Sequence, residues 1–506
     1  MDLLSHLATG FSVAVTPVNM LFCTIGVIAG TLIGALPGIG PVAGIAMLLP
    51  FAYGMEPVTA MILMAGIYSG TMFGGSITSV LVGIPGEASN IPTCLDGYEM
   101  AKKGRAGPAL TISAIGSFIA GTFSVVMLML FAPPIARWAL SFGPPEYFAL
   151  MLLGLGAVAG LMGDAKLKGY LMAFLGLTLS LVGFDMITGY QRFTFGSLAM
   201  ADGIKFLPIA VGLFGIAEVL LTLEQMASYK VIRASLKDMM ITPQDIRESA
   251  APIARGTVIG FLVGILPGAG GAVAALLSYV TERKFSKHPE RFGTGEIAGV
   301  AGPGSADNAS TGGSMIPMLT LGIPGSATTA VMLGALTLFN IQPGPFLFAS
   351  HPEFVWGLIA SMYIGNVMLL VLNIAFVPAF VQALRVPFTI LGPLIIVFAV
   401  VGVYSVSASM FDLWVLLIFS VLGYFMKKFG YPAAPMVLAL VLGNGLETAL
   451  RQSLMMSQGN ALIFFDRPIS GTLMVVVVLM LALPLLRLLI SKARHSVPGP
   501  SMTPKA

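Results

Sequence analysis

The chain has 506 residues, of which 57% are hydrophobic and only 9% are charged. Soluble domains carry roughly 25% charged residues, so this composition excludes an ordinary soluble globular protein and indicates a polytopic, all-α membrane protein. The formal net charge is +4, and the two cysteines, Cys23 and Cys94, predict buried thiols, with no disulfide framework and no metal spacing. The N-terminus has no basic stretch before its apolar part, so no cleavable signal peptide is expected.

Apolar stretches long enough to cross a bilayer recur along the chain. They cover residues 110–132, 146–162, 167–184, 203–223, 354–380, 387–406 and 470–490. With the interrupted segments described below, we expect about 11–12 membrane passages. The expected divisions are a first transmembrane repeat at 1–224, a cytoplasmic linker at 225–252 that forms a surface amphipathic helix, a second repeat at 253–450, an outer loop and final helix at 451–490, and a cytoplasmic tail at 491–506.

A duplicated pattern interrupts the apolar segments at matching places. Gly30–Gly40 and Gly260–Gly270 are identical at seven of eleven positions, 230 residues apart. In each copy a Gly-Gly-Ser (residues 74–76 and 312–314) leads to a Gly-Ile-Pro-Gly (residues 83–86 and 322–325). The 60 glycines and 33 prolines predict unwound backbone that lies inside protein or lines a cavity. Paired broken segments of this kind indicate a transport site.

Each Leu-Pro-Gly-x-Gly predicts the tip of a re-entrant hairpin. The arm at 256–266 would span about 16 Å of helix, roughly half of a ~30 Å hydrocarbon core. Placing both hairpin ends in the cytoplasm puts 21 of the 26 lysines and arginines inside and leaves five outside: Arg137, Arg192, Lys205, Arg451 and Arg467. The N-terminus is then periplasmic and the C-terminus cytoplasmic. Opposite loops are basic in the two copies, which predicts two inverted-topology repeats with broken passages at 57–101 and 296–345.

The stretch from Gly30 through Ala109 resembles the large membrane subunit of the tripartite tricarboxylate transporters, the TctA family. The resemblance is carried by the Leu-Pro-Gly motifs, by both Gly-Ile-Pro-Gly motifs and by the Lys102–Pro108 segment, and it extends over nearly the whole chain. It implies a bacterial inner-membrane subunit that works with a small membrane subunit and a periplasmic solute-binding protein. The three proteins would import citrate-like or other organic carboxylates, driven by an ion gradient and without a bound cofactor.

A carboxylate substrate needs hydrogen-bond donors, which glycine-rich turns and helix N-termini supply. The residues expected to bind it share such positions beside the interruptions: Gly74, Gly75, Ser76, Gly86, Ser89, Asn90, Gly312, Gly313, Ser314, Gly325, Ser326 and Thr328. The alternative is that these glycines only permit close helix packing while Ser and Thr satisfy freed backbone groups. The broken segments before Lys102 hold no Lys or Arg, so no cationic anchor is visible, and Lys102, Lys103 and Arg105 are expected to form an ordinary cytoplasmic loop.

A coupling Na⁺ or H⁺ needs oxygens, and an intramembrane carboxylate is a functional candidate. The expected coupling-ion residues form one run: Asp307, Asn308, Ser310 and Thr311. Glu87, Glu218 and Glu447 are weaker candidates of the same kind, and for Glu218 and Glu447, at the ends of spans, a solvated or snorkelled carboxylate is the favoured reading. The hairpin tips either touch substrate or ion through their backbone or act as hinges and packing points: Pro37, Gly38, Gly40, Pro267, Gly268 and Gly270.

Other classes fit less well. The chain has no metalloprotease, nucleophile-elbow or phosphate-loop motif, which argues against an enzyme and against ATP-driven transport. A passive anion channel stays open as an alternative, because broken helices also line pores. A purely structural subunit is the other alternative, and it predicts that replacing Ser89 or Asn308 changes assembly and not transport.

Overall fold

The structure is a computed structural model that describes residues 3–36, 38–160, 166–185, 187–224, 232, 239–383 and 388–480. Apart from the short antiparallel strands β1 (Gly183–Phe184) and β2 (Gln191–Arg192), the regular elements in these ranges are helices. Eight of them are long and apolar enough to cross a membrane: α2 (Pro17–Gly34), α4 (Pro57–Leu81), α6 (Ala106–Ala139), the continuous segment Phe206–Glu224, α11 (Pro243–Ile265), α16 (Pro352–Ala375), α18 (Phe388–Ser407) and α19 (Met410–Lys428). The prediction of an all-helical, multi-pass membrane protein is therefore confirmed.

The remaining helices are shorter or less apolar. They are α1 (Leu3–Ala14), α3 (Pro41–Ala52), α5 (Ile91–Lys102), α7 (Pro144–Gly160), α8 (Lys166–Ser180), α12 (Gly270–Phe285), α13 (Ala298–Leu321), α14 (Ala327–Leu338), α15 (Leu347–Ser350), α17 (Val377–Ala383), α20 (Ala434–Met456) and α21 (Ile463–Asp466). The segment Phe206–Glu224 consists of α9 (Phe206–Ala210), the π-helical turn η4 (Val211–Ile216) and α10 (Ala217–Glu224). A last apolar helix covers Pro468–Met480, so the far half of the predicted span 470–490 lies outside the described residues.

One predicted span differs from the observed helix. The span at 167–184 ends earlier, at Ser180, because Gly183 adopts φ +116° and starts the small β ribbon. Helix α11 starts at Pro243, within the range expected for the linker, while the boundary of the second repeat at 253 stays a prediction. A capping box fixes that start: Thr242 Oγ1 accepts the Asp245 N–H at 3.2 Å, and the Asp245 carboxylate accepts the Thr242 N–H. The rest of the predicted linker helix, 225–238, lies outside the described residues except for Ile232.

Both predicted broken passages are interrupted at their Gly-Ile-Pro-Gly motif. α4 ends at Leu81, Gly83 adopts φ +76°, and the chain resumes as helix after the short turn η1 (Ala88–Asn90). α13 ends at Leu321, Gly322 adopts φ +71°, and α14 begins behind Ser326, which caps it. A positive φ suits glycine because it has no Cβ, so the glycine at the head of each motif sets the place of the break.

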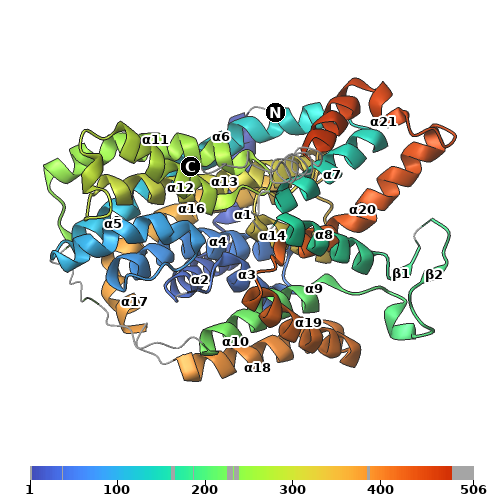
Figure 1. Cartoon of the computed structure of the whole chain (residues 1–506), viewed down its shortest axis with the longest axis horizontal. Coiled ribbons are helices and arrows are strands. Elements are labelled where there is room, and N and C mark those ends of the chain that lie inside the picture. The colour runs from blue at the N-terminus through green and yellow to red at the C-terminus, as the bar shows by residue number, and fades with distance from the viewer. Residues whose placement is uncertain are drawn as a thin grey trace, which may run out of the picture.

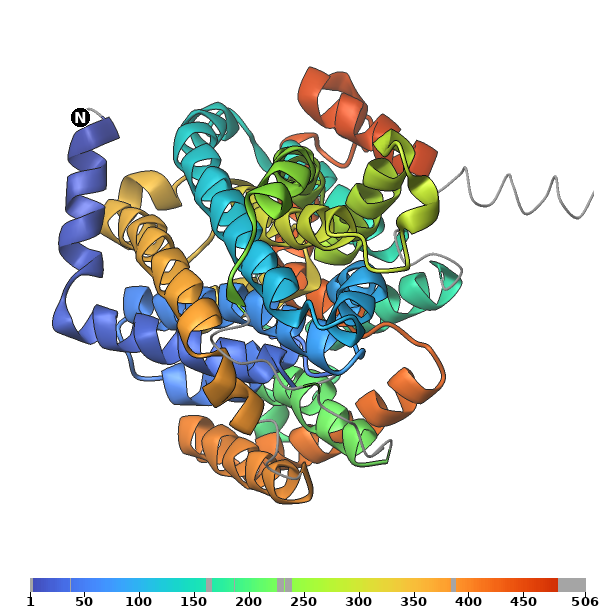
Figure 2. The ribbon, with the colours of Figure 1, turned by 90° about the vertical axis from the view of Figure 1, so that its left-hand side faces the viewer.

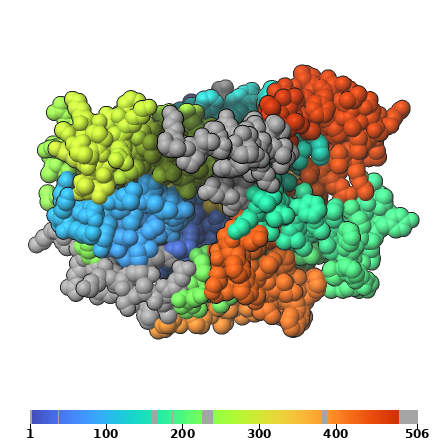
Figure 3. All heavy atoms as spheres, viewed as in Figure 1, coloured from blue at the N-terminus to red at the C-terminus, as the bar shows by residue number. Residues whose placement is uncertain are grey.

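Two helix pairs form the centre of the molecule, α2 packed on α4 and α11 packed on α13. Glycines allow the close approach: a Cβ on Gly264 would lie 2.5 Å from the Ser310 carbonyl oxygen, and one on Gly34 would meet the Thr71 carbonyl oxygen. In Figure 1 these pairs occupy the left and the middle of the view, with α7, α8 and α20 at the right-hand end and α10, α18 and α19 along the lower edge. In Figure 2 α1 lies beside α16 at the margin, and in Figure 3 α5 and α12 adjoin on one face.

Ion pairs fall into two groups. Arg192, Arg451 and Arg467, which the positive-inside rule places outside, pair with acids of outer loops or nearby helix ends. Arg105 and Arg255, placed inside, pair with Asp245 and Glu282. Among the described residues, no ion pair joins a basic residue of one group to an acid of the other. The charged residues are therefore sorted into two sets, as the threading of the chain requires.

Candidate functional site

Each Leu-Pro-Gly turn is tied to the Gly-Ile-Pro-Gly break that follows it by one backbone hydrogen bond. The Gly38 N–H donates to the Gly86 carbonyl at 3.0 Å, and the Gly268 N–H donates to the Gly325 carbonyl at 3.0 Å. Pro37 lies outside the described residues, whereas Pro267 is part of the second turn. Both bonds connect a Leu-Pro-Gly motif to a Gly-Ile-Pro-Gly motif, so the two motifs of each copy form one structural unit.

The same packing shows that the two Gly-Gly-Ser motifs are not equivalent residue by residue. The two breaks are offset by 239 residues (325 minus 86), not by the 238 that aligns the Gly-Gly-Ser motifs. Gly74 packs on the Thr31 carbonyl and its counterpart Gly313 packs on the Phe261 carbonyl, which is the 239 offset again. Gly312 instead faces Ser124 of α6. Sequence alignment of the short motif alone therefore missed the structural register by one residue.

With the offset of 239, Tyr68 of α4 occupies the position in the first half that Asp307 of α13 occupies in the second. Both side chains are buried. The Tyr68 hydroxyl lies 3.1 Å from Ser326 Oγ and 3.4 Å from Ser314 Oγ. Asp307 Oδ2 accepts a hydrogen bond of 3.0 Å from Ser89 Oγ. Each long helix thus sends a polar side chain to the residues that follow the break of the other half.

Two carboxyl groups share one hydroxyl at this junction. Ser89 Oγ is within hydrogen-bonding reach of both Glu87 Oε1 and Asp307 Oδ2. A hydroxyl carries one hydrogen, so it can donate to only one of the two carboxylates at a time. Two uncompensated negative charges in a buried site cost several kcal/mol, roughly, so this arrangement calls for a proton or a cation.

A free carboxylate oxygen supports that reading. Asp307 Oδ1 is buried and has no hydrogen-bond partner in the part of the chain that the structure describes. A Cβ added to Gly271, in the first turn of α12, would meet this oxygen. The same Cβ would lie 3.3 Å from Ser310 Oγ. The absence of a side chain at Gly271 therefore brings the N-terminus of α12, which carries a partial positive charge, close to the Asp307 carboxylate.

The predicted coupling residues do not all face this junction. Ser310 Oγ donates to the Asp307 carbonyl at 2.7 Å and shares the space beside Gly271. Asn308 points to α6 instead, where its Nδ2 donates to Ser117 Oγ at 2.8 Å. Thr311 is buried on the same helix and its hydroxyl lies 3.5 Å from the Asp307 carbonyl. Consecutive helical residues point about 100° apart, which is why Asn308 points away from Asp307, whereas Ser310 and Thr311, three and four residues on, share its helix face.

The residues predicted to bind substrate also fall into two groups, those that pack against neighbouring helices and those at the junction of the two breaks. Gly74, Gly86, Gly313 and Gly325 lie against neighbouring backbone, and Ser76 lies 3.1 Å from Ser113 of α6. Ser89, Ser314 and Ser326 gather at the junction of the two breaks, and Gly75 faces the Asn90 side chain, whose Oδ1 has no partner among the described groups. Thr328 is buried in the first turn of α14.

A cavity of about 420 Å³, called here the first-break cavity, opens beside the first interruption. Its lining includes Gly38, Gly40 and Glu87 from the first turn and break, together with Glu218 of α10 and Lys427 of α19. Glu218 was expected to be solvated, but it forms an ion pair with Lys427 and its side chain is only 13% exposed. The expectation failed because α19, distant in sequence, packs against α10 and supplies the partner. Glu447 is likewise paired, with Arg192 at 2.9 Å and with Arg451 at 3.1 Å.

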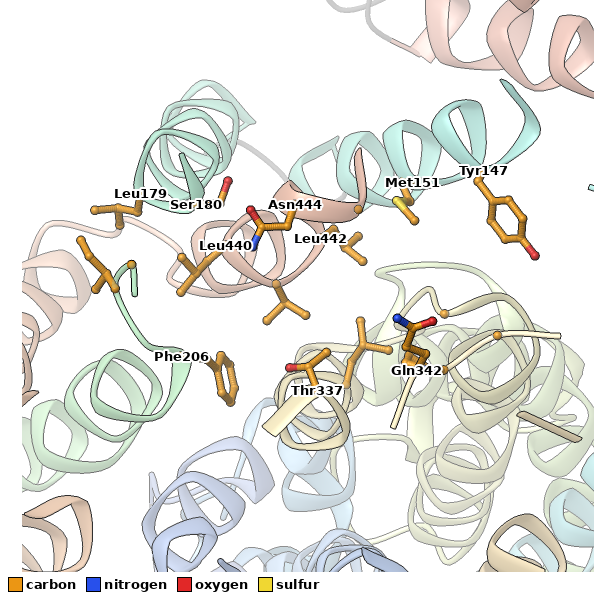
Figure 4. A pocket seen from close by; sticks show the side chains of 18 of the residues that line it. Tyr147, Met151, Leu179, Ser180, Phe206, Thr337, Gln342, Leu440, Leu442 and Asn444 are labelled. Carbon is orange, nitrogen blue, oxygen red and sulfur yellow. The ribbon is translucent and has the colours of Figure 1, made fainter. Parts of the chain in front are cut away.

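A larger cavity of about 850 Å³, called here the second-break cavity, lies beside Leu321 and Gly322. Figure 4 shows Thr337, Gln342 and Phe206 on one wall, facing Ser180 of α8, Asn444 of α20 and Met151 of α7. Among the described residues that line it, none is Lys, Arg or His. The two cavities therefore differ in charge, although each touches one broken helix.

Sequence reasoning missed two groups and underrated a third. Tyr68 would have been found by applying the offset of 239 to Asp307. No sequence pattern indicated a role for Lys427 in a site, because two adjacent lysines are typical of a cytoplasmic loop. Glu87 was only a weak candidate, and its pairing with Asp307 through Ser89 depends on contacts across 218 residues. The loop residues Lys102, Lys103 and Arg105 contact Glu99, Thr294 and Asp245, away from the junction.

Comparison with known proteins covers most of the chain. Residues 20–438 match the family model described as the tripartite tricarboxylate transporter TctA family. An uncharacterized 52.8 kDa protein in the TAR-I ttuC' 3' region of Agrobacterium vitis is 45% identical over 476 residues, 94% of this chain and 95% of the relative. An uncharacterized protein in the TAR-II ttuC' 3' region of the same organism is 42% identical over 231 residues, 45% of this chain and 96% of the relative. No solved structure matches.

Proposed function

Since the chain belongs to the tripartite tricarboxylate transporter TctA family, and so is a membrane transport subunit and not an enzyme, we propose that it is an ion-gradient-driven importer of tricarboxylates or related organic carboxylates. A periplasmic binding protein delivers the anion, and a small membrane subunit completes the inner-membrane complex. The observation that carries the proposal is the buried Glu87–Ser89–Asp307 junction, which joins the two breaks. A carboxylate anion and two adjoining carboxylates, Asp307 buried and Glu87 half-buried, are compatible only when a cation is bound with the anion.

The coupling ion sits at this junction. Glu87 is half-buried and lines the first-break cavity, while Asp307 is buried behind Ser89. An ion that enters from the cavity therefore meets Glu87 first and reaches Asp307 through the shared hydroxyl. Oxygen ligands of this kind accept either a proton or Na⁺, which would here be transported cargo. Ser310 adds an oxygen near Asp307, whereas Asn308 supports the helix packing.

The two halves are inverted-topology repeats with re-entrant hairpins. The matched bonds from Gly38 to Gly86 and from Gly268 to Gly325, and the opposed placement of basic loops, support this reading. The N-terminus is periplasmic and the C-terminus cytoplasmic. In such folds one site is exposed alternately to the two sides. The first-break cavity, which Lys427 lines, and the second-break cavity, whose described lining holds no cationic side chain, are the two openings.

Substrate binds next to the same junction. Ser89, Ser314 and Ser326, with Asn90 and Thr328, offer hydroxyl and amide groups, and the turns around Gly38 and Gly268 position them. The glycines at 74, 75, 86, 312, 313 and 325 bring the helices close enough for these groups to converge. The sequence of events is binding of cation, neutralisation of the junction, and entry of the anion.

The test is uptake into proteoliposomes that contain this chain and its small membrane partner. Labelled citrate and a panel of di- and tricarboxylates are offered with and without the binding protein, under an imposed Na⁺ or proton gradient. Accumulation that needs both the binding protein and one gradient is the expected result. Equilibration without a gradient would instead establish a channel or uniporter. Normal uptake by Ser89→Ala and Asp307→Asn, with altered assembly, would establish the structural-subunit alternative.

A further inference from the structure

The first-break cavity contains a lysine that reaches it from a distant helix. Lys427 lies in the last turn of α19 and forms an ion pair with Glu218 of α10, and both side chains line the cavity. The side chain of Lys427 is 24% exposed. Lys427 thus lies in a cavity beside the proposed transport site, paired with Glu218. In this position its ammonium group can leave the glutamate and pair with a carboxylate of the cargo.

Its neighbour in the sequence shows that this position is specific. Lys428 also pairs with a glutamate of α10, Glu224, at 2.7 Å, but both side chains are 45% exposed and Lys428 does not line the cavity. Lys428 additionally donates to the Tyr424 hydroxyl at 3.0 Å. Two consecutive lysines thus make similar ion pairs with the same helix, yet only Lys427 faces the broken segment.

The charges of the cavity repel an anion unless Glu87 is neutralised. Its described lining includes one cationic side chain, Lys427, and two acidic ones, Glu87 and Glu218. With all three ionised the lining is net negative and repels carboxylates. When the coupling ion neutralises Glu87 at the junction, the cargo can replace Glu218 as the partner of Lys427, because ammonium–carboxylate contacts are among the stronger hydrogen bonds in proteins.

We propose that Lys427 is the cationic contact for a carboxylate group of the transported anion, and that Glu218 holds the lysine while the cavity is empty. This inference rests on the proposed function, because it assigns the anion-binding group of the same transport site. It supplies the positive charge that the broken segments themselves lack. It also makes anion binding depend on the cation, since Glu87 lines the same cavity.

The experiment compares Lys427→Gln with the matched variant Lys428→Gln in the reconstituted complex, with citrate and a dicarboxylate as cargo. The expected result is a KM raised roughly 10- to 100-fold by Lys427→Gln, the usual effect of removing one charged contact, and less than about 2-fold by Lys428→Gln. Thermal unfolding of both variants in detergent reports folding. The double variant Glu218→Gln/Lys427→Gln removes the orphaned charge, so its KM must stay raised even if Lys427→Gln folds poorly.

A charge reversal separates this role from that of a structural ion pair. Glu218→Lys/Lys427→Glu restores the pair and should restore thermal stability while the KM stays high. Recovery of the normal KM by the reversal, or equal effects of Lys427→Gln and Lys428→Gln, would overturn the inference while leaving carboxylate transport intact. If the unaltered complex transports no carboxylate at all, the proposed function itself fails.

Discussion

Ser89 and Asp307, which are 218 residues apart in the chain, are joined by a hydrogen bond of 3.0 Å inside the protein. The serine follows the break of the first half and the aspartate lies within the long helix that precedes the break of the second. Because Ser89 also contacts Glu87, the bond makes a two-carboxylate site out of groups that neither half possesses alone. Movement of one half against the other changes this site directly.

Ser89→Ala should weaken coupling without unfolding the protein. Removing the shared hydroxyl takes one ligand from the ion, so the ion concentration for half-maximal uptake should rise about 10-fold, as expected for loss of one charged hydrogen bond. Asp307→Asn should abolish accumulation against a gradient. Ser420→Ala is the control, because its buried hydroxyl bonds only within α19, to the Leu416 carbonyl at 2.6 Å. Equal ion dependence in all three variants would refute the coupling site.

Gly264→Ala should destabilise the protein by about 1–3 kcal/mol or more, because a Cβ there would lie 2.5 Å from the Ser310 backbone oxygen, which cannot move aside as a side chain can. The measurement is the thermal unfolding of the purified protein in detergent. Gly156→Ala in α7 is the matched control: its Cβ would meet only the end of the Met480 side chain, at 3.5 Å. A loss of stability as large in Gly156→Ala would contradict the packing argument.

Asp96→Ala should disconnect α5 from the start of α13. Asp96 Oδ1 accepts the N–H groups of Gly293, Gly295 and Glu296, each at 2.8 Å, and Oδ2 accepts the Tyr279 hydroxyl at 2.9 Å. Leaving these donors without an acceptor should cost roughly 3 kcal/mol, as judged from charged hydrogen bonds.

Proteolysis of the 286–297 loop and thermal unfolding both report that change. Glu99→Ala, which removes only the exposed pair with Lys102, should cost about 0.5 kcal/mol or less. If Asp96→Ala is cleaved at the same rate and unfolds at the same temperature as Glu99→Ala, the hydrogen bonds of Asp96 do not stabilise the protein.

The Asp185 loop should make stability depend on pH. The Ile187 N–H, foremost among several hydrogen bonds that include Arg451, holds the pKa of Asp185 well below its ordinary value. A lowered folded-state pKa stabilises the protein above the unfolded pKa of about 3.9, and this contribution is lost as the pH falls through and below that value.

Melting temperatures of the unaltered protein and of Asp185→Asn, measured from about pH 7 down to about pH 3.5, test this. The unaltered protein should be the more stable at neutral pH, and the difference should shrink as the pH falls. A difference that stays constant, or grows in acid, would rule out the carboxylate as its source.

The broken segments were predictable from the sequence because their cause is local. Glycine at positions 83 and 322 adopts positive φ, and the prolines that follow cannot continue a helix, so the motif by itself interrupts the chain. The same holds for the apolar spans, whose length alone suits a bilayer. Asp307 was a candidate because a carboxylate in an apolar segment is a functional hypothesis, and its role stays a prediction. The end of α8 at Ser180 also has a local cause, because Gly183 starts the β ribbon, but the length of the apolar stretch did not indicate it.

Only the tertiary structure decided what surrounds Asp307. The sequence placed Asn308 with it, but helical geometry turns Asn308 toward Ser117 of α6, while Ser89 arrives from the other half. The fold likewise turned Lys427 from an ordinary loop cation into a cavity residue, because α19 packs on α10. Composition and motifs are local properties of the chain and determine where it spans and where it breaks. Which charges meet is set by contacts between helices hundreds of residues apart, and no local pattern encodes them.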